Sequence, residues 1–227
     1  MTTVDDILYE LRAQANPRNV EGQARYGIRP KREILGLSAP QMRAVAKPRR
    51  GDHDLALALW DTGVHEARHV AAMIDDAALV TKGQMDAWAR DWDSWDICDG
   101  CCFHLFDRTP HAIDKAFRWA NRTHEFVKRG AFALMASLAI HDKAAPDDLF
   151  RSFLPVIESA ATDDRTYVKK GVNWALRQIG KRNAALHADA VARAERIAGI
   201  DARAARWIAS DALRELRSDK MRARLGL

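Results

Sequence analysis

The segment Phe126-Val127-Lys128-Arg129-Gly130 returns 41 positions later, from 126 to 167, as Tyr167-Val168-Lys169-Lys170-Gly171. Each copy opens a stretch of helical periodicity that follows a shorter helical stretch. A weaker copy, Glu-Ala-Arg-His-Val, lies at residues 66–70. Pairs of helices that recur at about 40 residues bury a core only by stacking on their neighbours.

This repeat predicts an all-α, HEAT-like helical-repeat solenoid of stacked antiparallel helix pairs, curved, with a concave basic face. Ala, Leu, Arg, Glu and Asp dominate, and alternating strand-like runs are missing from the sequence. We expect one domain over residues 1–227, with an N-terminal cap region at 1–50, helical repeats at 51–217 and a short basic tail at 218–227. The expected helices span roughly 53–61, 64–80, 83–90, 93–106, 111–121, 124–141, 146–159, 165–182, 184–197 and 201–217.

Local signals mark the N-terminal region. Thr3 and Asp6 have the spacing of a capping box, and Ser38 precedes a helix with Pro40 in its first turn. Residues 17–37 are rich in Gly, Pro and Arg, which predicts an irregular connection.

The charge balance favours a polyanionic partner. The 227 residues contain 36 Lys and Arg against 31 Asp and Glu, a formal net charge of +5. The polar, acidic N-terminus does not have the pattern of a secretory signal, and apolar runs stay well short of the ~18 residues that cross a membrane. The three cysteines, Cys98, Cys101 and Cys102, crowd one segment and predict reduced thiols. We therefore expect a cytoplasmic protein without a membrane partner.

Asp99 is difficult to explain by packing alone. On a helix through 92–106 it shares a face with aromatic side chains at 92, 95, 103 and 106. A carboxylate there is costly to bury without a partner. Either Asp99 lies at a core edge bonded to a backbone group or an Arg, or it is an anion held near a cationic substrate or transition state.

Trp174 and Arg129 are similarly unusual. Trp174 lies off the apolar face of its helix, in a stripe with Lys170, Arg177 and Lys181. It either covers the next helix pair or offers a stacking surface between phosphate-binding cations. Arg129 has apolar residues on two sides, so its guanidinium forms a structural ion pair or binds Asp99, a phosphate or both.

Two patterns in the sequence resemble metal sites but are weak evidence for a bound metal. Residues 65–69, His-Glu-Ala-Arg-His, match H-E-x-x-H literally, but they coincide with the weaker copy of the helical repeat, and the third ligand would have to be a distant Glu. The cysteines at 98, 101 and 102 point in different directions on a helix, so we expect small buried hydrophobes. Loops that bind nucleotide phosphates are missing from the sequence. We therefore predict neither a metal nor a cofactor.

With these residues in view, the chain resembles the DNA alkylation repair family of AlkD-like glycosylases from about Ile34 to Asn183. Residues 35–43, LGLSAPQMR, are similar to the family's early LG-x-x-x-P-x-x-R segment, and Glu66 and Arg68 take the E-x-R position. Three further segments resemble the family's functional ones: Trp95-Asp96-Ile97-Cys98-Asp99, Val127-Lys128-Arg129-Gly130-Ala131 and Trp174-Ala175-Leu176-Arg177. Ser94 stands where well-known members have a second Trp, which bears on the range of lesions.

The resemblance implies hydrolysis of the N-glycosidic bond of N3- or N7-alkylated purines in duplex DNA, without a base-flipping pocket. It implies that Asp99 stabilises the oxocarbenium-like sugar and orients water, that Trp95 and Trp174 bracket the sugar, and that Arg129 holds a phosphate and positions Asp99. The DNA backbone would be bound by cations along the face: Lys169, Lys170, Arg177, Lys181 and Arg43. We expect a monomer that is nucleoid-associated when on DNA.

Two alternatives stay open. The family also contains members that bind DNA without excising a base, so a non-catalytic DNA-binding scaffold is the first. A solenoid that binds another protein is the second, and it predicts DNA affinity with little dependence on salt.

Overall fold

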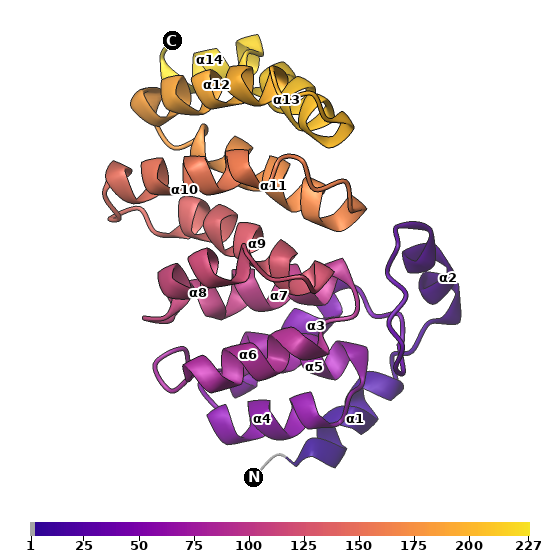
Figure 1. The fold of residues 1–227 in the computed structure, drawn as a ribbon. Helices are drawn as coiled ribbons and strands as arrows, with labels where there is room; N and C mark the ends of the chain where they lie inside the picture. Colours follow the sequence, from indigo (N-terminus) through magenta and orange to yellow (C-terminus); the bar gives the residue numbers. More distant parts are fainter. Residues whose placement is uncertain (1–2) are drawn as a thin grey trace. The chain divides into compact units, whose positions relative to one another are not determined.

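In the computed structural model, which describes residues 3–227, the chain consists of α-helices and two short 3-10 helices, joined mostly by short turns and by a longer connection at residues 26–38 (Figure 1). Contacts divide it into two units, residues 1–111 and 112–227. Within the described part of the chain, no helix is long and apolar enough to span a membrane. The organisation into one domain with a concave face stays a prediction.

The first unit contains seven α-helices and two short 3-10 helices within its described residues. Their bounds are α1 Val4–Arg12, α2 Pro17–Arg25, α3 Ala39–Ala46, η1 Lys47–Arg49, α4 His53–Asp61, α5 His65–Ile74, α6 Lys82–Asp91, α7 Trp95–His104 and η2 Phe106–Arg108. Helix α5 lies at the centre, since it packs against α3, α4 and α7. The core includes tryptophans on α4 and α6 whose rings, Trp60 and Trp88, stack at 4.0 Å.

The second unit is a regular stack of helix pairs (Figure 1). Its helices are α8 Ala112–Trp119, α9 Glu125–His141, α10 Asp147–Ser159, α11 Thr166–Ile179, α12 Ala184–Ala198, α13 Arg203–Leu216 and α14 Asp219–Leu225. Helices α9, α11 and α13 form one row, with α11 packed against both neighbours, and α10 packs against α12 in the other. Most of α9 is buried from Val127 to Ala139, which makes it the central core helix.

The sequence repeat coincides with this stacking. Its two copies open α9 and α11, and the rings of Phe126 and Tyr167 lie 5.4 Å apart. The Glu125 carboxylate accepts a hydrogen bond from the Tyr167 amide at 3.1 Å. Equivalent positions of successive pairs are therefore in contact, which explains why this pattern recurs.

Local capping signals are confirmed. The Thr3 side chain accepts from the Asp6 amide at 3.2 Å, and the Asp6 carboxylate accepts from the Thr3 amide at 2.9 Å. The Ser38 amide donates to the side chain of Gln41 at 2.9 Å, with Pro40 in the first turn of α3.

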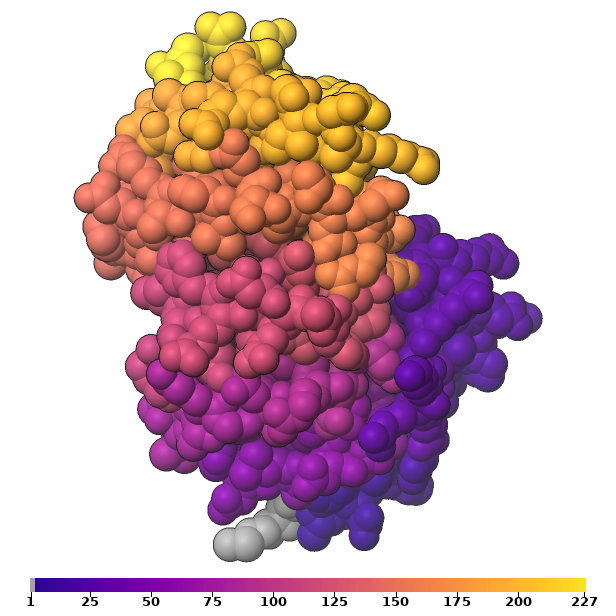
Figure 2. All heavy atoms as spheres, in the orientation of Figure 1, coloured from indigo at the N-terminus to yellow at the C-terminus, as the bar shows by residue number. Residues whose placement is uncertain are grey.

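The expectation of an irregular connection over residues 17–37 is wrong for residues 17–25, because α2 occupies Pro17–Arg25. Asn16 caps this helix by accepting from the Arg18 and Asn19 amides, and Pro17 begins it. No residue of α2 is buried, and its indigo segment stands out at the edge of the first unit (Figure 2). Capping rather than an apolar face forms this helix, so periodicity could not reveal it.

Three other boundaries differ. The helix expected over 64–80 ends at Ile74, because Asp75 is extended and the Asp76 carboxylate accepts from the Ala78 amide in a turn. The helix expected over 93–106 covers only Trp95–His104. The expected tail at 218–227 contains α14, which Ser218 caps by accepting from the Met221 amide at 3.3 Å.

Candidate active-site helices

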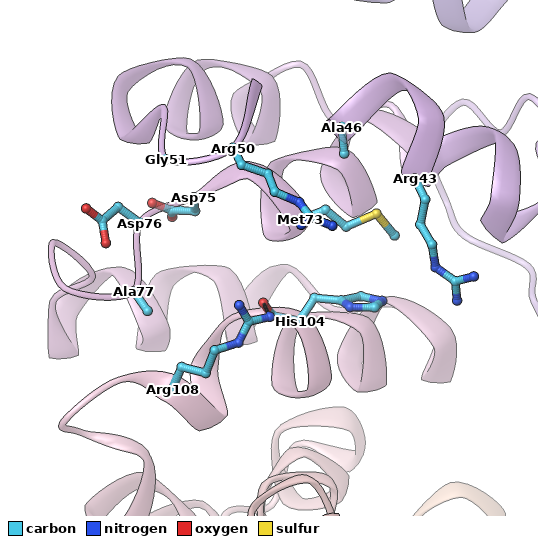
Figure 3. Close-up of a pocket in the computed structure, with 10 residues that line it drawn as sticks. All are labelled: Arg43, Ala46, Arg50, Gly51, Met73, Asp75, Asp76, Ala77, His104 and Arg108. Atoms are coloured by element: carbon cyan, nitrogen blue, oxygen red, sulfur yellow. Dashed lines mark hydrogen bonds between the residues drawn. The ribbon is translucent and has the colours of Figure 1, made fainter. Parts of the chain in front are cut away.

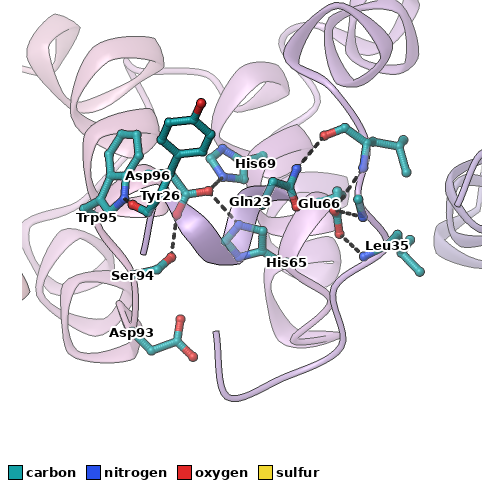
Figure 4. A network of polar contacts seen from close by, with 12 residues as sticks. Gln23, Tyr26, Leu35, His65, Glu66, His69, Asp93, Ser94, Trp95 and Asp96 are labelled. Carbon is teal, nitrogen blue, oxygen red and sulfur yellow. Dashed lines mark hydrogen bonds and ion pairs between the residues drawn. The ribbon is translucent and has the colours of Figure 1, made fainter. Parts of the chain in front are cut away.

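The start of α7 is fixed to α5 by one carboxylate. Asp96 Oδ2 lies 2.8 Å from His65 Nε2 and 3.2 Å from His69 Nε2, while Asp96 Oδ1 accepts from the Ser94 hydroxyl at 2.5 Å (Figure 4). The two histidines reach the same oxygen because residues four apart share a helix face. We call these three residues, His65, His69 and Asp96, the Asp96 cluster.

Mutual interactions outweigh burial in setting the pKa values of Asp96 and His65. Burial by itself would raise the pKa of Asp96, but the hydrogen bonds from His65 and His69 outweigh it and hold that pKa far below its usual range. Burial would lower the pKa of His65, whereas its hydrogen bond and attraction to Asp96 raise it above the ordinary 6.5. The folded state therefore favours an ionised Asp96 beside a protonated His65.

A pH dependence of stability follows. Because the pKa of His65 is raised in the folded state, its stabilising contribution is complete below pH 6.5 and is lost as pH rises through the folded pKa. We expect the free energy of unfolding to fall more steeply above pH 6.5 in the wild type than in His65→Gln. Urea titrations between pH 5 and 9 measure this difference. His111→Gln is the matched control, and equal slopes in all three proteins would contradict the prediction.

The Glu of the H-E-x-x-H pattern has a structural partner. Glu66 is buried, and its carboxylate accepts from the backbone amides of Leu35, Gly36 and Leu37 at 2.9, 2.7 and 3.3 Å (Figure 4). Gly36 is in the left-handed region at φ +82°, and a Cβ there would collide with the Asn16 carbonyl. These contacts leave Glu66 bound to a turn of the chain, which does not suit a metalloprotease base.

The Asp96 cluster also has the residue types of a metal site. Its potential ligand atoms lie within 4.8 Å of one another. The third group is Asp96, whereas the sequence suggested only a distant Glu. The separations of 2.8 and 3.2 Å are those of hydrogen bonds, so the cluster is accounted for as a link between α5 and α7.

Trp95 and Asp99 lie one turn apart on α7, and both are half-buried. Trp95 Nε1 donates to the Tyr26 carbonyl at 3.0 Å, so the segment that ends α2 supports the indole. The Tyr26 ring itself is 77% exposed. Trp95 and Asp99 are thereby presented together on the side of α7 that is not buried.

The opposite side of α7 is closed. Cys98, Cys101 and Cys102 are fully buried reduced cysteines, and burial raises the pKa of Cys101 and Cys102 well above its usual range. They are small core side chains, as expected from the sequence. The aromatic stripe expected around Asp99 is wrong in part, because Trp92 and Phe106 lie outside the helix and are buried.

In the second unit, Arg129 and Trp174 occupy the packed helices α9 and α11. Arg129 is only 6% exposed and donates from Nη1 to the Tyr167 carbonyl at 2.7 Å. A Cβ on Gly171 of α11 would lie 3.4 Å from Arg129 Cγ, an ordinary van der Waals distance, so the two helices are in contact here. Trp174, three residues further along α11, is half-buried.

The five predicted DNA-binding cations have unequal surroundings. Lys170 and Arg43 are exposed. Lys169 pairs with Asp164 at 3.4 Å and lies 5.9 Å from the centre of the Trp207 ring. Of the five predicted cations, Lys170 and Arg43 form no ion pair within residues 3–227, whereas Lys169 does.

The acidic partners of the other two cations come from α13. Arg177 and Lys181 both pair with Glu215, and Arg177 also lies 3.9 Å from Asp211. Sequence reasoning missed these partners because they belong to the next helix pair. Their spacing of 34 to 38 residues from the cations, close to one repeat, is the signal that could have found them.

Comparison with solved structures found a chain of similar fold. A solved structure described as "a new family of proteins related to the HEAT-like repeat DNA glycosylases with affinity for branched DNA structures" is similar, with a TM-score of 0.79 and 18% identity over 100% of this chain and 97% of that one. A designed armadillo repeat protein bound to the peptide (KR)4 gives a TM-score of only 0.39 at 12% identity, over 99% and 87% of the two chains. No curated protein matches.

The first similarity confirms the predicted all-α, HEAT-like repeat fold. The family model described as "DNA alkylation repair enzyme" matches residues 7–216, which contain all the helices discussed above except part of α1 and α14. This extent includes, and goes beyond, residues 34–183, where the sequence showed the resemblance. The chain belongs to the DNA alkylation repair enzyme family.

Proposed function

We propose that this protein is a DNA glycosylase that hydrolyses the N-glycosidic bond of N3- or N7-alkylated purines in duplex DNA, without a pocket for a flipped base. Membership of the DNA alkylation repair enzyme family supports the substrate class. The observation that carries the proposal is the presentation of Trp95 and Asp99, half-buried and one turn apart, on a helix fixed at its start by the Asp96 cluster.

The chemistry suits these two side chains. An alkylated purine is cationic, so it leaves as a neutral base with the electron pair of the C1′–N bond. The deoxyribose then carries positive charge, which the Asp99 carboxylate stabilises. A water oxygen forms the new bond to C1′, and its proton passes to Asp99 and then to solvent. The Trp95 ring adds a π-face for the cationic sugar.

The second unit supplies groups for the DNA backbone in this proposal. In this proposal Arg129, which donates to the Tyr167 carbonyl, holds a DNA phosphate through its guanidinium. Trp174 is the second stacking surface for the sugar. Lys170 and Arg43, which are exposed, are better placed to meet phosphates than Lys169, Arg177 and Lys181, whose charges are paired.

Removing the Trp174 ring should weaken both binding and excision. Loss of a base- or sugar-stacking surface costs about 1–3 kcal/mol, so we expect Trp174→Ala to bind duplex DNA roughly 5- to 150-fold more weakly. Fluorescence anisotropy with a labelled duplex measures this change. Tyr9→Ala, which removes a 79% exposed ring from α1, is the control. A Trp174→Ala affinity equal to that of the control would exclude the stacking role.

The experiment that tests the function uses the purified protein, without added metal, and duplex DNA containing N7-methylguanine. The proposal expects free N7-methylguanine and an abasic site, detected by chromatography and by strand cleavage in alkali. Retention of the modified base under saturating protein would refute glycosylase activity on this lesion.

A second candidate is a DNA-binding protein without excision activity. The similar solved structure favours it, because the family of that protein is described as having affinity for branched DNA structures. This candidate expects tighter binding to a four-way junction than to the same sequence as a linear duplex, with no base released. Equal affinity for both forms together with base release would support the glycosylase instead.

A further inference from the structure

A pocket in the first unit is lined by three arginines, one on α3, one in the turn after η1 and one on η2. Its volume is about 460 Å³, and it lies where α3, α5 and α7 end. The basic side chains that line it are Arg43, Arg50, His104 and Arg108. The segment after α5 adds two carboxylates, Asp75 and Asp76 (Figure 3).

Two of its arginines have charges that other side chains do not balance. Within residues 3–227, Arg43 and Arg50 form no ion pair, and both are exposed. Arg108 donates from Nη2 to the His104 carbonyl, which orients its guanidinium, and its side chain remains 61% exposed beside Asp107 at 3.9 Å. Figure 3 shows the Arg50 and Arg108 side chains extending toward each other from opposite walls of the pocket.

The two carboxylates of the lining are already engaged. The Asp75 side chain is fully buried, and its oxygens lie 2.6 Å from His53 Nδ1 and 2.6 Å from Gln84 Nε2. Asp76 Oδ1 accepts from the Ala78 amide at 2.9 Å, and Figure 3 shows this carboxylate turned away from Arg108. Both carboxylates are therefore bound to groups other than the arginines of the pocket, whose guanidinium groups face the pocket.

The backbone holds the arginines in place. The Gly51 amide donates to the Ile74 carbonyl at 2.6 Å, and Gly51 has φ +85°, so the turn that carries Arg50 is bound to the end of α5. Arg108 ends η2, whose Phe106 side chain is fully buried. Cations on fixed backbone lose less conformational freedom when they bind an anion than cations on a loose tail.

We infer that this pocket binds a phosphate group, with Arg50 and Arg108 as the paired ligands and Arg43 at its rim. Guanidinium groups bind phosphate oxygens through paired hydrogen bonds, and three of them match a group with several charged oxygens better than a single carboxylate. The phosphate belongs to a DNA backbone or to a free phosphate ion. That the phosphate comes from DNA rests on the proposed function. That the pocket binds a phosphate group does not.

The first arm of the test uses inorganic phosphate and no DNA. Calorimetric titration of the full chain should show saturable binding that Arg50→Gln and Arg108→Gln each weaken at least tenfold. Arg222→Gln, which changes an exposed arginine on α14, should bind as the wild type does. Urea midpoints equal to that of the wild type show that the variants are folded. A wild type that binds no phosphate, or variants that bind it equally well, would overturn the inference.

The second arm identifies the source of the phosphate with an undamaged duplex. The slope of log K against log salt changes by about 0.9 for each DNA phosphate that the protein no longer neutralises. A slope that falls by that amount or more in the Arg50→Gln/Arg108→Gln double variant supports a backbone phosphate. An unchanged slope, with phosphate binding abolished in the first arm, supports the pocket with free phosphate as its ligand. A changed slope without phosphate binding by the wild type overturns the inference, since any surface cation would produce it.

Neither arm depends on excision. Asp99→Asn, which should remove base release, should bind inorganic phosphate like the wild type. An inactive protein with an intact phosphate site would therefore refute the proposed function alone.

Discussion

Asp99→Asn is expected to lower the release of N7-methylguanine from duplex DNA by a factor of about 10²–10³ or more, which is the typical cost of removing one preorganised electrostatic contact to a transition state. The substitution keeps the size of the side chain and removes its charge, so the developing positive charge on the sugar loses its stabilising anion. Duplex binding should change little, because a carboxylate opposes rather than assists phosphate binding. Single-turnover release of free base, with anisotropy for binding, measures both quantities.

Asp54→Asn provides the matched control, because Asp54 is an exposed carboxylate on α4 of the same unit. It should excise at the wild-type rate. An Asp99→Asn protein with unchanged excision would remove Asp99 from the mechanism. A protein whose binding collapses together with excision would instead indicate that Asp99 maintains the structure of the binding surface.

Glu66→Ala is expected to lower the free energy of unfolding by about 3–5 kcal/mol, because it removes several buried hydrogen bonds to a charged group, each of which contributes about 1.5–3 kcal/mol. The Glu66 side chain accepts from three consecutive backbone amides in the turn at residues 35–37. Alanine leaves these donors unpaired and opens a cavity beneath α3. Urea denaturation followed by circular dichroism measures the loss.

Two variants control for this interpretation. Glu66→Gln keeps one acceptor oxygen and the side-chain volume, so we expect a smaller loss than in Glu66→Ala. Glu10→Ala removes the surface partner of Arg49 and should cost no more than about 1 kcal/mol. If Glu66→Ala is no more destabilised than Glu10→Ala, the turn at residues 35–37 does not depend on the carboxylate.

The five residues at 65–69 act together as a junction of the first unit. His65 and His69 bind Asp96 at the start of α7, and Glu66 binds the turn before α3. Arg68 donates to the Trp60 carbonyl at 3.2 Å and to the Asp91 carboxylate at 3.2 Å. A pattern that resembles a zinc-protease motif thus binds four neighbouring segments, among them the helix that presents Trp95 and Asp99.

Much of the helical framework follows from local features of the sequence. A capping box such as that of Thr3 and Asp6 depends on residues three apart, and helical periodicity depends on residues within two turns. The repeat at 126–130 and 167–171 showed which helices occupy equivalent positions, and both copies open the helices expected of them. Asp99, Arg129 and Trp174 were selected by poor agreement with packing and by resemblance, Trp95 by resemblance alone, and the roles of all four stay predictions.

Only the tertiary structure decided which charged groups are paired. Arg177 and Lys181 look like a cationic stripe along one helix, yet Glu215 of the next pair lies against both. Asp96 likewise binds histidines 27 and 31 residues away. Such pairs depend on the register between packed helices, and a shift of one residue rotates a side chain by about 100° around its helix axis. The sequence by itself therefore determined where helices form and repeat, whereas the packing of one helix on another determined which of their charges meet.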